Sequence, residues 1–281
     1  MNQLHTQQMI DTLIELALEE DMAQGDVTTE AIFPDRRMAK ARIHAKEDGV
    51  ISGLDVARRV LERVGDCRFS PLVEDGAFVS KGTIVLELEG DYQTLLKAER
   101  TMLNFMQRMS GIATLTRRFV QAVGDCKTKI LDTRKTLPGF RLLDKQAVRH
   151  GGGTNHRMGL YDMVMLKDNH IKAVGSITEA VRMVRTRVPI SIKIEVETTN
   201  LAEVEEALGA GADIIMLDNM SNEMTAEAVS MIAGRAKVEA SGNMSLERVA
   251  EVAALGVDYI SVGALTHSVK ALDLSMNFID N

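Results

Sequence analysis

The chain of 281 residues has no tryptophan, and only 4% of its residues are aromatic. Stacking platforms for single-stranded nucleic acid are therefore not expected, since they are built from aromatic side chains. Cys67 and Cys126 are the two cysteines, too few for a disulfide framework or a cysteine metal motif. No apolar run approaches the roughly 18–20 residues that a membrane-spanning helix needs. The first residues, MNQLHTQQMIDTLIELALEED, lack a basic start, and Glu15 interrupts their apolar part. We expect an amphipathic helix there rather than a signal peptide, and a cytoplasmic protein without a nucleic-acid or membrane partner.

Several common catalytic and nucleotide-binding motifs are also missing. The sequence contains no GxGxxG, GxxxxGK[ST], HExxH or GxSxG pattern. Hydrophobic residues make up 45% of the chain, which is ordinary for a globular protein with a sizeable core. The length predicts one large domain or two of moderate size.

The stretch from Asp132 to His170 carries an excess of positive charge. It contains seven lysines and arginines, three histidines and four acids, whereas the whole chain has a formal net charge of -7. Three consecutive glycines, Gly151 to Gly153, lie in the same stretch and would let the backbone approach a ligand closely. A basic segment in an acidic chain indicates a local anion-binding site.

The first half of the sequence predicts an α+β arrangement with antiparallel strands. Short alternating runs, AKARIHAKEDGVISG and CRFSPLVEDGAFVSKGTIVLELEGD, are broken by turn residues, and a helical pattern fits residues 54–64. Gly25 to Thr29 is typical of a turn. A long helix is predicted to begin near Tyr92, with a kink or interruption at Ser110-Gly111.

After Lys127 the chain alternates apolar strands with helical patterns, and the last four strands recur at the spacing of one βα unit. The predicted strands are KTKILDTR, DMVMLKD, SIKIEVE, DIIMLDN, AKVEASG and DYISVG. Repeated βαβ units mean a parallel sheet, either a (β/α) barrel or a doubly wound sheet. Polar residues end nearly every strand, which favours the barrel, because barrels build active sites at that end. A doubly wound sheet would place its chemistry at one switch point.

Four cations at strand ends are the candidate anion ligands: Arg134, Lys135, Arg157 and Lys167. Arginine matches planar carboxylates bidentately, and lysine supplies a point charge. His156, beside Arg157, would act as a neutral donor or as a cation. A solvated basic surface is the alternative, but the neighbouring glycines and strand ends favour binding.

The candidate acids are Glu195, Glu197 and Asp218. Glu195 and Glu197 are two residues apart, so on a strand they face the same side. Such acids could hold sugar hydroxyls, bind a hydrated Mg²⁺ or stabilise a developing cation. Alternatively, they pair with the arginines and lysines of the barrel as a structural network.

The loops after the last two strands, Ser241-Gly242-Asn243 and Gly263-Ala264, predict a phosphate site. In barrels, backbone N–H groups of the corresponding loops often bind phosphate. Lys167 also leaves a second reaction class open, because a lysine crowded by cations can serve as a Schiff-base lysine.

Read in order, TRKTLPGFR, AVRHGGGTNHRMGL, MLKDNHI, KIEVE, IIMLDN and EASG resemble the quinolinate phosphoribosyltransferase family (nicotinate-nucleotide pyrophosphorylase, carboxylating). The resemblance extends from GDVTT through AERTMLNFMQRMSGIAT to SVGALTHS. It implies an α/β fold with an N-terminal α+β sandwich domain, residues 1–112, to which residues 270–281 return. Residues 113–269 would form an open (β/α) barrel of the type II phosphoribosyltransferase kind. It also implies transfer of phosphoribosyl from phosphoribosyl pyrophosphate to quinolinate, with Mg²⁺, giving nicotinate mononucleotide, pyrophosphate and CO₂ in NAD biosynthesis.

The resemblance further implies a homodimer with shared active sites. By motif, Arg134, His156, Arg157 and Lys167 would hold quinolinate, with Arg100 arriving from the other subunit. Lys135 would serve phosphoribosyl pyrophosphate. Glu197 and Asp218 would face the ribose and the metal, although residue pattern alone does not decide between Glu195 and Glu197. Ser241, Gly242, Asn243, Gly263 and Ala264 would hold the 5′-phosphate. A non-catalytic, anion-binding member of the family is the alternative, and the complete cation set argues against it.

Overall fold

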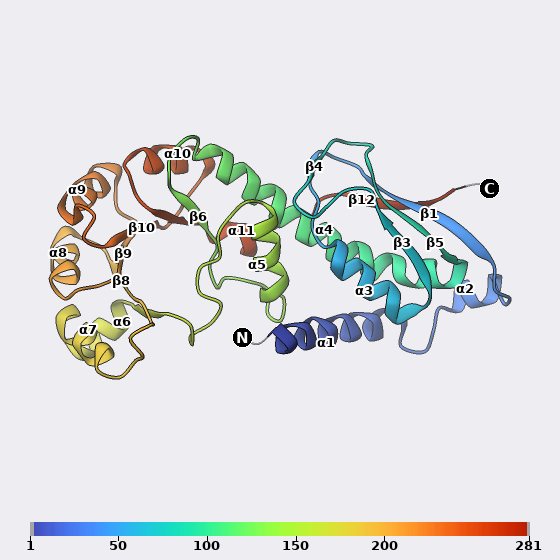
Figure 1. Ribbon diagram of the computed structural model, residues 1–281, viewed down its shortest axis with the longest axis horizontal. Helices are drawn as coiled ribbons and strands as arrows, with labels where there is room; N and C mark the ends of the chain where they lie inside the picture. Colours follow the sequence, from blue (N-terminus) through green and yellow to red (C-terminus); the bar gives the residue numbers. More distant parts are fainter. Residues whose placement is uncertain (1–2, 280–281) are drawn as a thin grey trace. The chain divides into compact units, whose positions relative to one another are not determined.

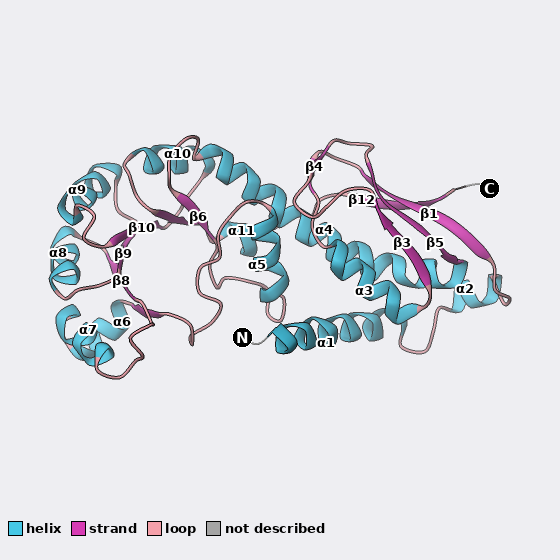
Figure 2. Cartoon of the chain, viewed as in Figure 1, coloured by secondary structure: helices cyan, strands magenta, loops and turns pink. Residues whose placement is uncertain are grey.

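The computed structural model describes residues 3–279 and divides into two compact units, each with its own sheet (Figures 1 and 2). Unit 1 comprises Met1–Arg117, Thr136–Gly152 and Leu265–Asn281, and unit 2 comprises Arg118–Lys135 and Gly153–Ala264. This division assigns residues 136–152 to unit 1, whereas the sequence prediction counted them with the barrel. The boundaries 1–112, 113–269 and 270–281 stay a prediction, and residues 1, 2, 280 and 281 of those ranges lie outside the described residues.

Unit 1 is built on an antiparallel sheet in the order β12-β1-β5-β3. Its strands are β1 (Met38–Ala45), β3 (Cys67–Pro71), β5 (Ile84–Asp91) and β12 (Leu274–Phe278). Alternate residues of β1 are buried, as expected for a sheet with one face on the core. Strand β12 comes from the end of the chain and pairs with β1, Ala41 opposite Phe278. The predicted antiparallel α+β arrangement is confirmed; β2 (Gly49–Val50) and β4 (Phe78–Val79) form a separate pair.

The helices of unit 1 follow the predicted pattern with two corrections. They are α1 (Gln3–Met22), α2 (Val27–Ile32), α3 (Leu54–Val64), α4 (Tyr92–Ala122), whose last turn passes into unit 2, and α5 (Arg141–His150). The predicted turn after Gly25 is wrong, because Asp26 caps α2 by accepting hydrogen bonds from the N–H groups of Thr28 and Thr29. The predicted interruption of α4 is also wrong, since the helix runs through Ser110 and Gly111.

Gly111 serves packing rather than bending. A Cβ at this position would lie 2.2 Å from the carbonyl oxygen of Lys270, so only glycine lets the two backbones come this close. The neighbouring Ser110 hydroxyl donates to the carbonyl oxygen of Ser52 at 3.1 Å and accepts from its N–H at 2.9 Å. Both residues therefore satisfy contacts between segments distant in sequence.

Unit 2 contains a parallel sheet in the order β6-β11-β10-β9-β8-β7, six strands within the described residues. They are β6 (Lys129–Leu131), β7 (Val164–Leu166), β8 (Ile194–Thr198), β9 (Ile214–Asp218), β10 (Lys237–Ser241) and β11 (Tyr259–Ser261). All six predicted strands are confirmed. Strands β7 to β11 are neighbours in chain order without a reversal, so the doubly wound alternative is wrong and the predicted open barrel is confirmed.

Helices follow the barrel strands and lie along the outer side of the curved sheet (Figure 1). They are α6 (Asp168–Val174), α7 (Ile177–Arg185), α8 (Leu201–Gly209), α9 (Asn222–Ile232) and α10 (Leu246–Ala254), and the short α11 (Ala264–His267) follows β11. Side chains of Ser176, Asn200, Ser221 and Ser245 cap the starts of α7 to α10. Since the strands are parallel, their carboxyl ends meet at one edge, and the predicted site residues of unit 2 follow those ends.

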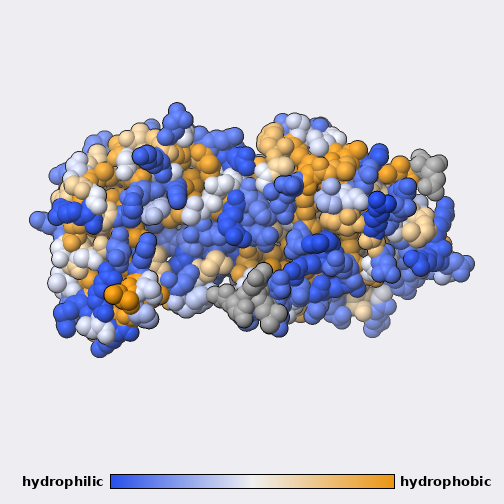
Figure 3. All heavy atoms as spheres, viewed as in Figure 1, coloured by the Kyte–Doolittle hydropathy of each residue, from blue (hydrophilic) through white to orange (hydrophobic). Residues whose placement is uncertain are grey.

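The surface mixes polar and apolar residues, and Figure 3 shows both on the drawn face. Large apolar side chains that are more than half exposed include those of Leu16, Phe78, Leu160 and Tyr161. Among residues 3–279, no helix is both long enough and apolar enough to cross a membrane.

One buried ion pair links elements of unit 1. Arg108 on α4 binds the fully buried Asp144 of α5 through two hydrogen bonds, Nε to Oδ1 at 2.9 Å and Nη2 to Oδ2 at 2.8 Å. Burial raises the pKa of Asp144, and the Arg108 guanidinium opposes that rise. Arg108 also lies over the ring of Phe140, 5.5 Å from its centre.

We predict that Arg108→Met destabilises the protein by ~3–5 kcal/mol, because it leaves the Asp144 carboxylate buried and unpaired. Without the guanidinium, the folded-state pKa of Asp144 would rise further above its unfolded value. The folded state would then bind more protons, so the loss should be largest near neutral pH and shrink as pH falls. Urea unfolding at several pH values measures this. The double variant Arg108→Met/Asp144→Leu should recover most of the stability, and a pH-independent loss would contradict the role given to Asp144.

Candidate active site

Lys167 and Glu197 form an ion pair at the carboxyl edge of the barrel sheet. Lys167 follows β7, Glu197 lies near the end of β8, and the distance from Nζ to Oε2 is 3.1 Å. The Lys167 side chain is 47% exposed and that of Glu197 is 17% exposed, so both remain open to a ligand. The structure thus brings together one predicted quinolinate ligand and one predicted ribose or metal ligand.

Glu195 and Glu197 face the same side of β8 but lie at different depths. Glu195 precedes Glu197 and is fully buried, whereas Glu197 lies nearer the carboxyl end and pairs with Lys167. A group that binds substrate at the strand ends must be reachable from that edge. Glu197 is therefore the acid that can face a ribose, while Glu195 belongs to the barrel interior.

A buried polar cluster fills the interior below the site. The Nε2 atom of His156 lies 3.1 Å from Oε2 of Glu195 and 3.4 Å from Oε2 of Glu239, and both glutamates are fully buried. Ser261 donates its hydroxyl proton to Oε1 of Glu239. Strands β8, β10 and β11 thereby contribute polar groups to a single point.

The cluster shifts the proton equilibria of its members. Burial alone would lower the pKa of His156, but the hydrogen bonds and charges of the two carboxylates raise it to about 10. Burial raises the pKa of Glu195 to about 7, and His156 opposes this. The Arg157 N–H donates to Nδ1 of His156 at 2.8 Å, which requires an unprotonated Nδ1 and conflicts with a fully protonated ring. The ring therefore presents Nε2 to the two carboxylates and Nδ1 to the backbone N–H of Arg157.

Arg134 and Arg157 form a second concentration of charge at the same edge. Burial lowers the pKa of Arg157, and the nearby charge of Arg134 lowers it further. Arg157 also donates from Nη1 to the carbonyl oxygen of Met163 at 3.1 Å. Two neighbouring guanidinium groups repel each other, and a bound anion would relieve that repulsion.

Asp132, at the end of β6, holds the segment that carries His156 and Arg157. It is fully buried and accepts hydrogen bonds from the Asn155 side chain at 2.6 Å and the His156 N–H at 2.9 Å. The position of Arg157 therefore depends on a carboxylate that does not itself reach the surface.

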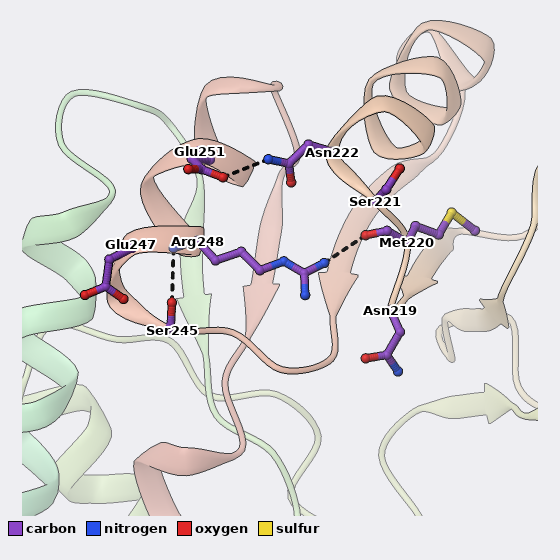
Figure 4. A pocket seen from close by; sticks show the side chains of 8 residues that line it. All are labelled: Asn219, Met220, Ser221, Asn222, Ser245, Glu247, Arg248 and Glu251. Carbon is purple, nitrogen blue, oxygen red and sulfur yellow. Dashed lines mark hydrogen bonds between the residues drawn. The ribbon is translucent and has the colours of Figure 1, made fainter.

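The loop after β10 adopts an unusual backbone conformation. Gly242 and Asn243 have φ values of 94° and 47°, and Asn219, in the loop after β9, has 55°. The side chain of Arg248, on α10, donates to the carbonyl oxygens of Gly242 and Met220 at 3.2 and 2.8 Å. Figure 4 shows Arg248 reaching from α10 to Met220 along a pocket of about 540 Å³.

The other predicted residues are placed as follows. Lys135 is exposed after β6, and its N–H donates to the Thr133 hydroxyl at 3.1 Å. Gly263 and Ala264 lie at the start of α11 and are partly exposed. Arg100 is exposed on α4 in unit 1, so the structure assigns it to a different unit from the other predicted ligands.

A Mg²⁺ ion fits the predicted acids by donor chemistry. Glu197 and Asp218 come from the neighbouring strands β8 and β9, and their side chains are only partly buried. Mg²⁺ usually binds through one or two carboxylates together with substrate phosphates and water. Among the described residues, the group of three side chains close enough to hold an ion by themselves is His156, Glu195 and Glu239, and Ser261 already donates to Glu239 within it.

Sequence reasoning missed three residues of this region, Glu239, Arg248 and Ser261, and it placed Asn219 at a strand end without giving it a role. Glu239 carried a usable signal, because it is an acid inside the otherwise apolar strand AKVEASG, as Glu195 is in SIKIEVE. Arg248 carried none, since its contacts involve loops that only the fold brings together.

Comparison with known proteins accounts for nearly the whole chain. Residues 26–110 match the model of the quinolinate phosphoribosyl transferase N-terminal domain, and residues 112–277 match that of the C-terminal domain. A probable nicotinate-nucleotide pyrophosphorylase [carboxylating] from Synechocystis is 44% identical over 97% of this chain and 94% of its own length. Its namesake from Bacillus subtilis is 44% identical over 92% and 89%.

Solved structures agree with the sequence matches. NadC from Streptococcus pyogenes is 45% identical and superposes with a TM-score of 0.93, covering 96% of this chain and 97% of the other. The nicotinate-nucleotide pyrophosphorylase from Francisella tularensis is 41% identical, also with a TM-score of 0.93, covering 97% and 96%. The chain belongs to the quinolinate phosphoribosyltransferase family.

Proposed function

We propose that the protein transfers the phosphoribosyl group of phosphoribosyl pyrophosphate to quinolinate with decarboxylation, giving nicotinate mononucleotide, pyrophosphate and CO₂ in NAD biosynthesis. The observation that carries this proposal is the juxtaposition of cations and acids at the barrel edge. Arg134 and Arg157 neighbour each other there, and Lys167 pairs with Glu197. Family membership supports the same activity, since relatives of similar length bear its name.

Quinolinate is a dianion, and the cations suit its two carboxylates. The guanidinium groups of Arg134 and Arg157 can bind a carboxylate in bidentate fashion, and Lys167 adds a point charge. His156 would act indirectly, because its Nε2 faces Glu195 and Glu239 while its Nδ1 accepts from the backbone N–H of Arg157. Lys135, exposed beside Arg134, would bind the pyrophosphate group of the second substrate.

The acids suit the sugar. Departure of pyrophosphate leaves positive charge at the anomeric carbon, and a nearby carboxylate stabilises such a centre. Glu197 and Asp218 would face the ribose from adjacent strands and would hold Mg²⁺, which supplies charge neutralisation to the pyrophosphate. Backbone N–H groups of Ser241, Gly242, Asn243, Gly263 and Ala264 would bind the 5′-phosphate.

Decarboxylation follows from the substrate itself. Once the ring nitrogen is bonded to ribose, the ring is a pyridinium. It accepts the electron pair of the bond to the 2-carboxylate as CO₂ leaves, and a proton then takes the vacant position on that carbon.

The Schiff-base alternative finds no support in the site. A Schiff-base lysine must have its amine free to attack a carbonyl, whereas Lys167 forms an ion pair with Glu197 at 3.1 Å. The ion pair therefore suits a lysine that binds an anion.

We further propose a homodimer in which Arg100 enters the site of the other subunit. Arg100 is exposed on α4, and several large apolar side chains of unit 1 are exposed, including Leu16, Met38, Leu72 and Phe78. Exposed apolar side chains beyond the usual scatter favour an association surface. A two-fold dimer would exchange Arg100 twice, once for each site.

The first prediction concerns substrate choice. Quinolinate should react, whereas nicotinate, which lacks the 2-carboxylate, should lose its interaction with part of the cation cluster and so lose roughly 2–5 kcal/mol of binding. Turnover of each compound with phosphoribosyl pyrophosphate, and CO₂ release from quinolinate with and without it, measures this. Comparable turnover of nicotinate would contradict the assignment of the cations.

The second prediction concerns the acids. Glu197→Gln and Asp218→Asn should each lower kcat by roughly 100-fold, the scale of losing one electrostatic group in the transition state, and should weaken Mg²⁺ binding. Quinolinate affinity of the free enzyme, measured by calorimetry, should change little by comparison. Asp168→Asn is the control, since this exposed acid forms an ion pair with Lys172 in its own helix. Normal turnover with lost quinolinate affinity would show that the acids are wrongly assigned.

The third prediction concerns the shared site. Arg100→Ala and Lys167→Ala homodimers should each be nearly inactive, but mixing them under conditions of subunit exchange should restore activity. In a mixed dimer one site has both residues intact, so about a quarter of wild-type sites should return with equal amounts. If exchange is demonstrated and activity does not recover, Arg100 serves its own subunit or neither.

A further inference from the structure

The loops after β9 and β10 contain three residues in the left-handed backbone region. Asn219 has a φ of 55°, Gly242 of 94° and Asn243 of 47°. Side chains other than glycine rarely adopt this conformation, and asparagine tolerates it best because its amide can bond locally. Backbone strain at neighbouring positions of two loops persists only where surrounding contacts maintain it.

The side chain of Asn219 supplies those contacts. Its Nδ2 donates to Oδ2 of Asp218 at 2.9 Å, and its Oδ1 accepts from Nδ2 of Asn243 at 3.2 Å. The Asn219 N–H donates to the carbonyl oxygen of Ser241 at 3.0 Å. One residue therefore bonds to the acid at the end of β9 and to both ends of the Ser241–Asn243 loop.

Gly242 lies directly against this amide. A Cβ built on Gly242 would be 2.1 Å from Oδ1 of Asn219 and 2.4 Å from Cγ. No side chain fits at that distance, so any residue larger than glycine would push the Asn219 amide away from Asp218 and Asn243.

Arg248 ties the same two loops together at their main chain. It donates from Nη1 to the carbonyl oxygen of Gly242 at 3.2 Å and from Nη2 to that of Met220 at 2.8 Å. In Figure 4 its guanidinium reaches the chain at Met220, next to Asn219. The loops after β9 and β10 are thus connected through both the Asn219 amide and the Arg248 guanidinium, as expected for two loops whose separation is held fixed.

We propose that Asn219 is a positioning residue that sets the Asp218 carboxylate and the Ser241–Asn243 loop in one geometry. This inference rests on the proposed function, in which Asp218 faces the ribose and the loop binds the 5′-phosphate. Both ends of the phosphoribosyl group would then be located by a single amide. The quinolinate cations lie after β6 and β7, so their affinity for quinolinate does not depend on Asn219.

The Asn219→Gly substitution removes the side-chain amide while leaving the backbone conformation unchanged, so it tests the amide alone. Glycine keeps the left-handed conformation without cost, so the variant should fold and melt like the wild type. Loss of hydrogen bonds that include a charged acceptor should raise KM for phosphoribosyl pyrophosphate by roughly 10- to 100-fold. Calorimetric affinity of the free enzyme for quinolinate should stay unchanged. An unchanged KM, or an equal loss of quinolinate affinity, would overturn the proposal.

Asn222→Ala is the matched control. Asn222 lines the same pocket, and its amide bonds to Glu251 at 2.8 Å rather than to Asp218 or the Ser241–Asn243 loop (Figure 4). This variant should behave as the wild type in both measurements. A KM as high as that of Asn219→Gly would show that any lost amide in the pocket has the effect, which would overturn the specific role.

A double-variant cycle tests the contact between Asn219 and Gly242. Gly242→Ala should raise KM for phosphoribosyl pyrophosphate because its Cβ displaces the Asn219 amide. In the Asn219→Gly background that amide is gone, so the same substitution should raise KM by a smaller factor. Independent, multiplicative effects would show that Gly242 does not act through Asn219.

Amide hydrogen exchange tests whether Asn219 connects the loops after β9 and β10, and it does not require enzyme activity. Amides in residues 216–221 and 239–245 should exchange faster in Asn219→Gly than in the wild type, and Asn222→Ala should leave residues 239–245 unchanged. Unchanged exchange in Asn219→Gly would overturn the proposal even if the enzyme is active. Faster exchange in a protein whose wild type does not convert quinolinate would support the connection and reject the proposed function instead.

Discussion

The candidate site is built above two buried carboxylates that both face the ring of one histidine. Glu195 and Glu239 are fully buried on β8 and β10, and two like charges in a low-dielectric interior would be costly without a shared proton or cation. Nε2 of His156 lies 3.1 Å from Glu195 and 3.4 Å from Glu239. Since the Arg157 N–H donates to Nδ1 of the same ring, the position of these buried acids also bears on the backbone that carries Arg157, a proposed quinolinate ligand.

A second constraint follows from the distribution of charge at the carboxyl edge. Burial and the nearby charge of Arg134 lower the pKa of Arg157, whereas Lys167 is already paired with Glu197. An incoming dianion therefore gains most at the arginines, where repulsion is relieved, and must compete with Glu197 for Lys167. Such competition would leave the Glu197 carboxylate freer for the ribose and metal once quinolinate is bound, which couples the two halves of the proposed site.

Local sequence patterns were sufficient for most of the fold and for the charged residues at the strand ends. Residues 54–64 form α3 as their helical periodicity predicts, and each barrel strand falls on a predicted run, although β8 extends one residue beyond its run to Thr198. The break predicted at Ser110-Gly111 is wrong because a glycine in a helix signals either a bend or a close contact, and only the fold shows that Lys270 makes the contact. Composition likewise could not show that Asp26 would cap a helix rather than belong to a turn.

The residues that sequence could not provide share one property: they act on other residues and not on the ligand. Glu239 on β10 contacts Ser261 on β11 and His156 in the segment after β6, and Asn219 bonds to a loop that begins only after another complete βα unit. A strand-end rule finds charges that face a substrate, because their position relative to one strand suffices. It does not find residues that hold other side chains in position, because their contacts join two different strands or loops. In a barrel, neighbouring loops jointly form one site. The geometry of that site therefore depends on the contacts between loops, so an uncharged amide that joins two loops can affect binding as much as a charged ligand residue does.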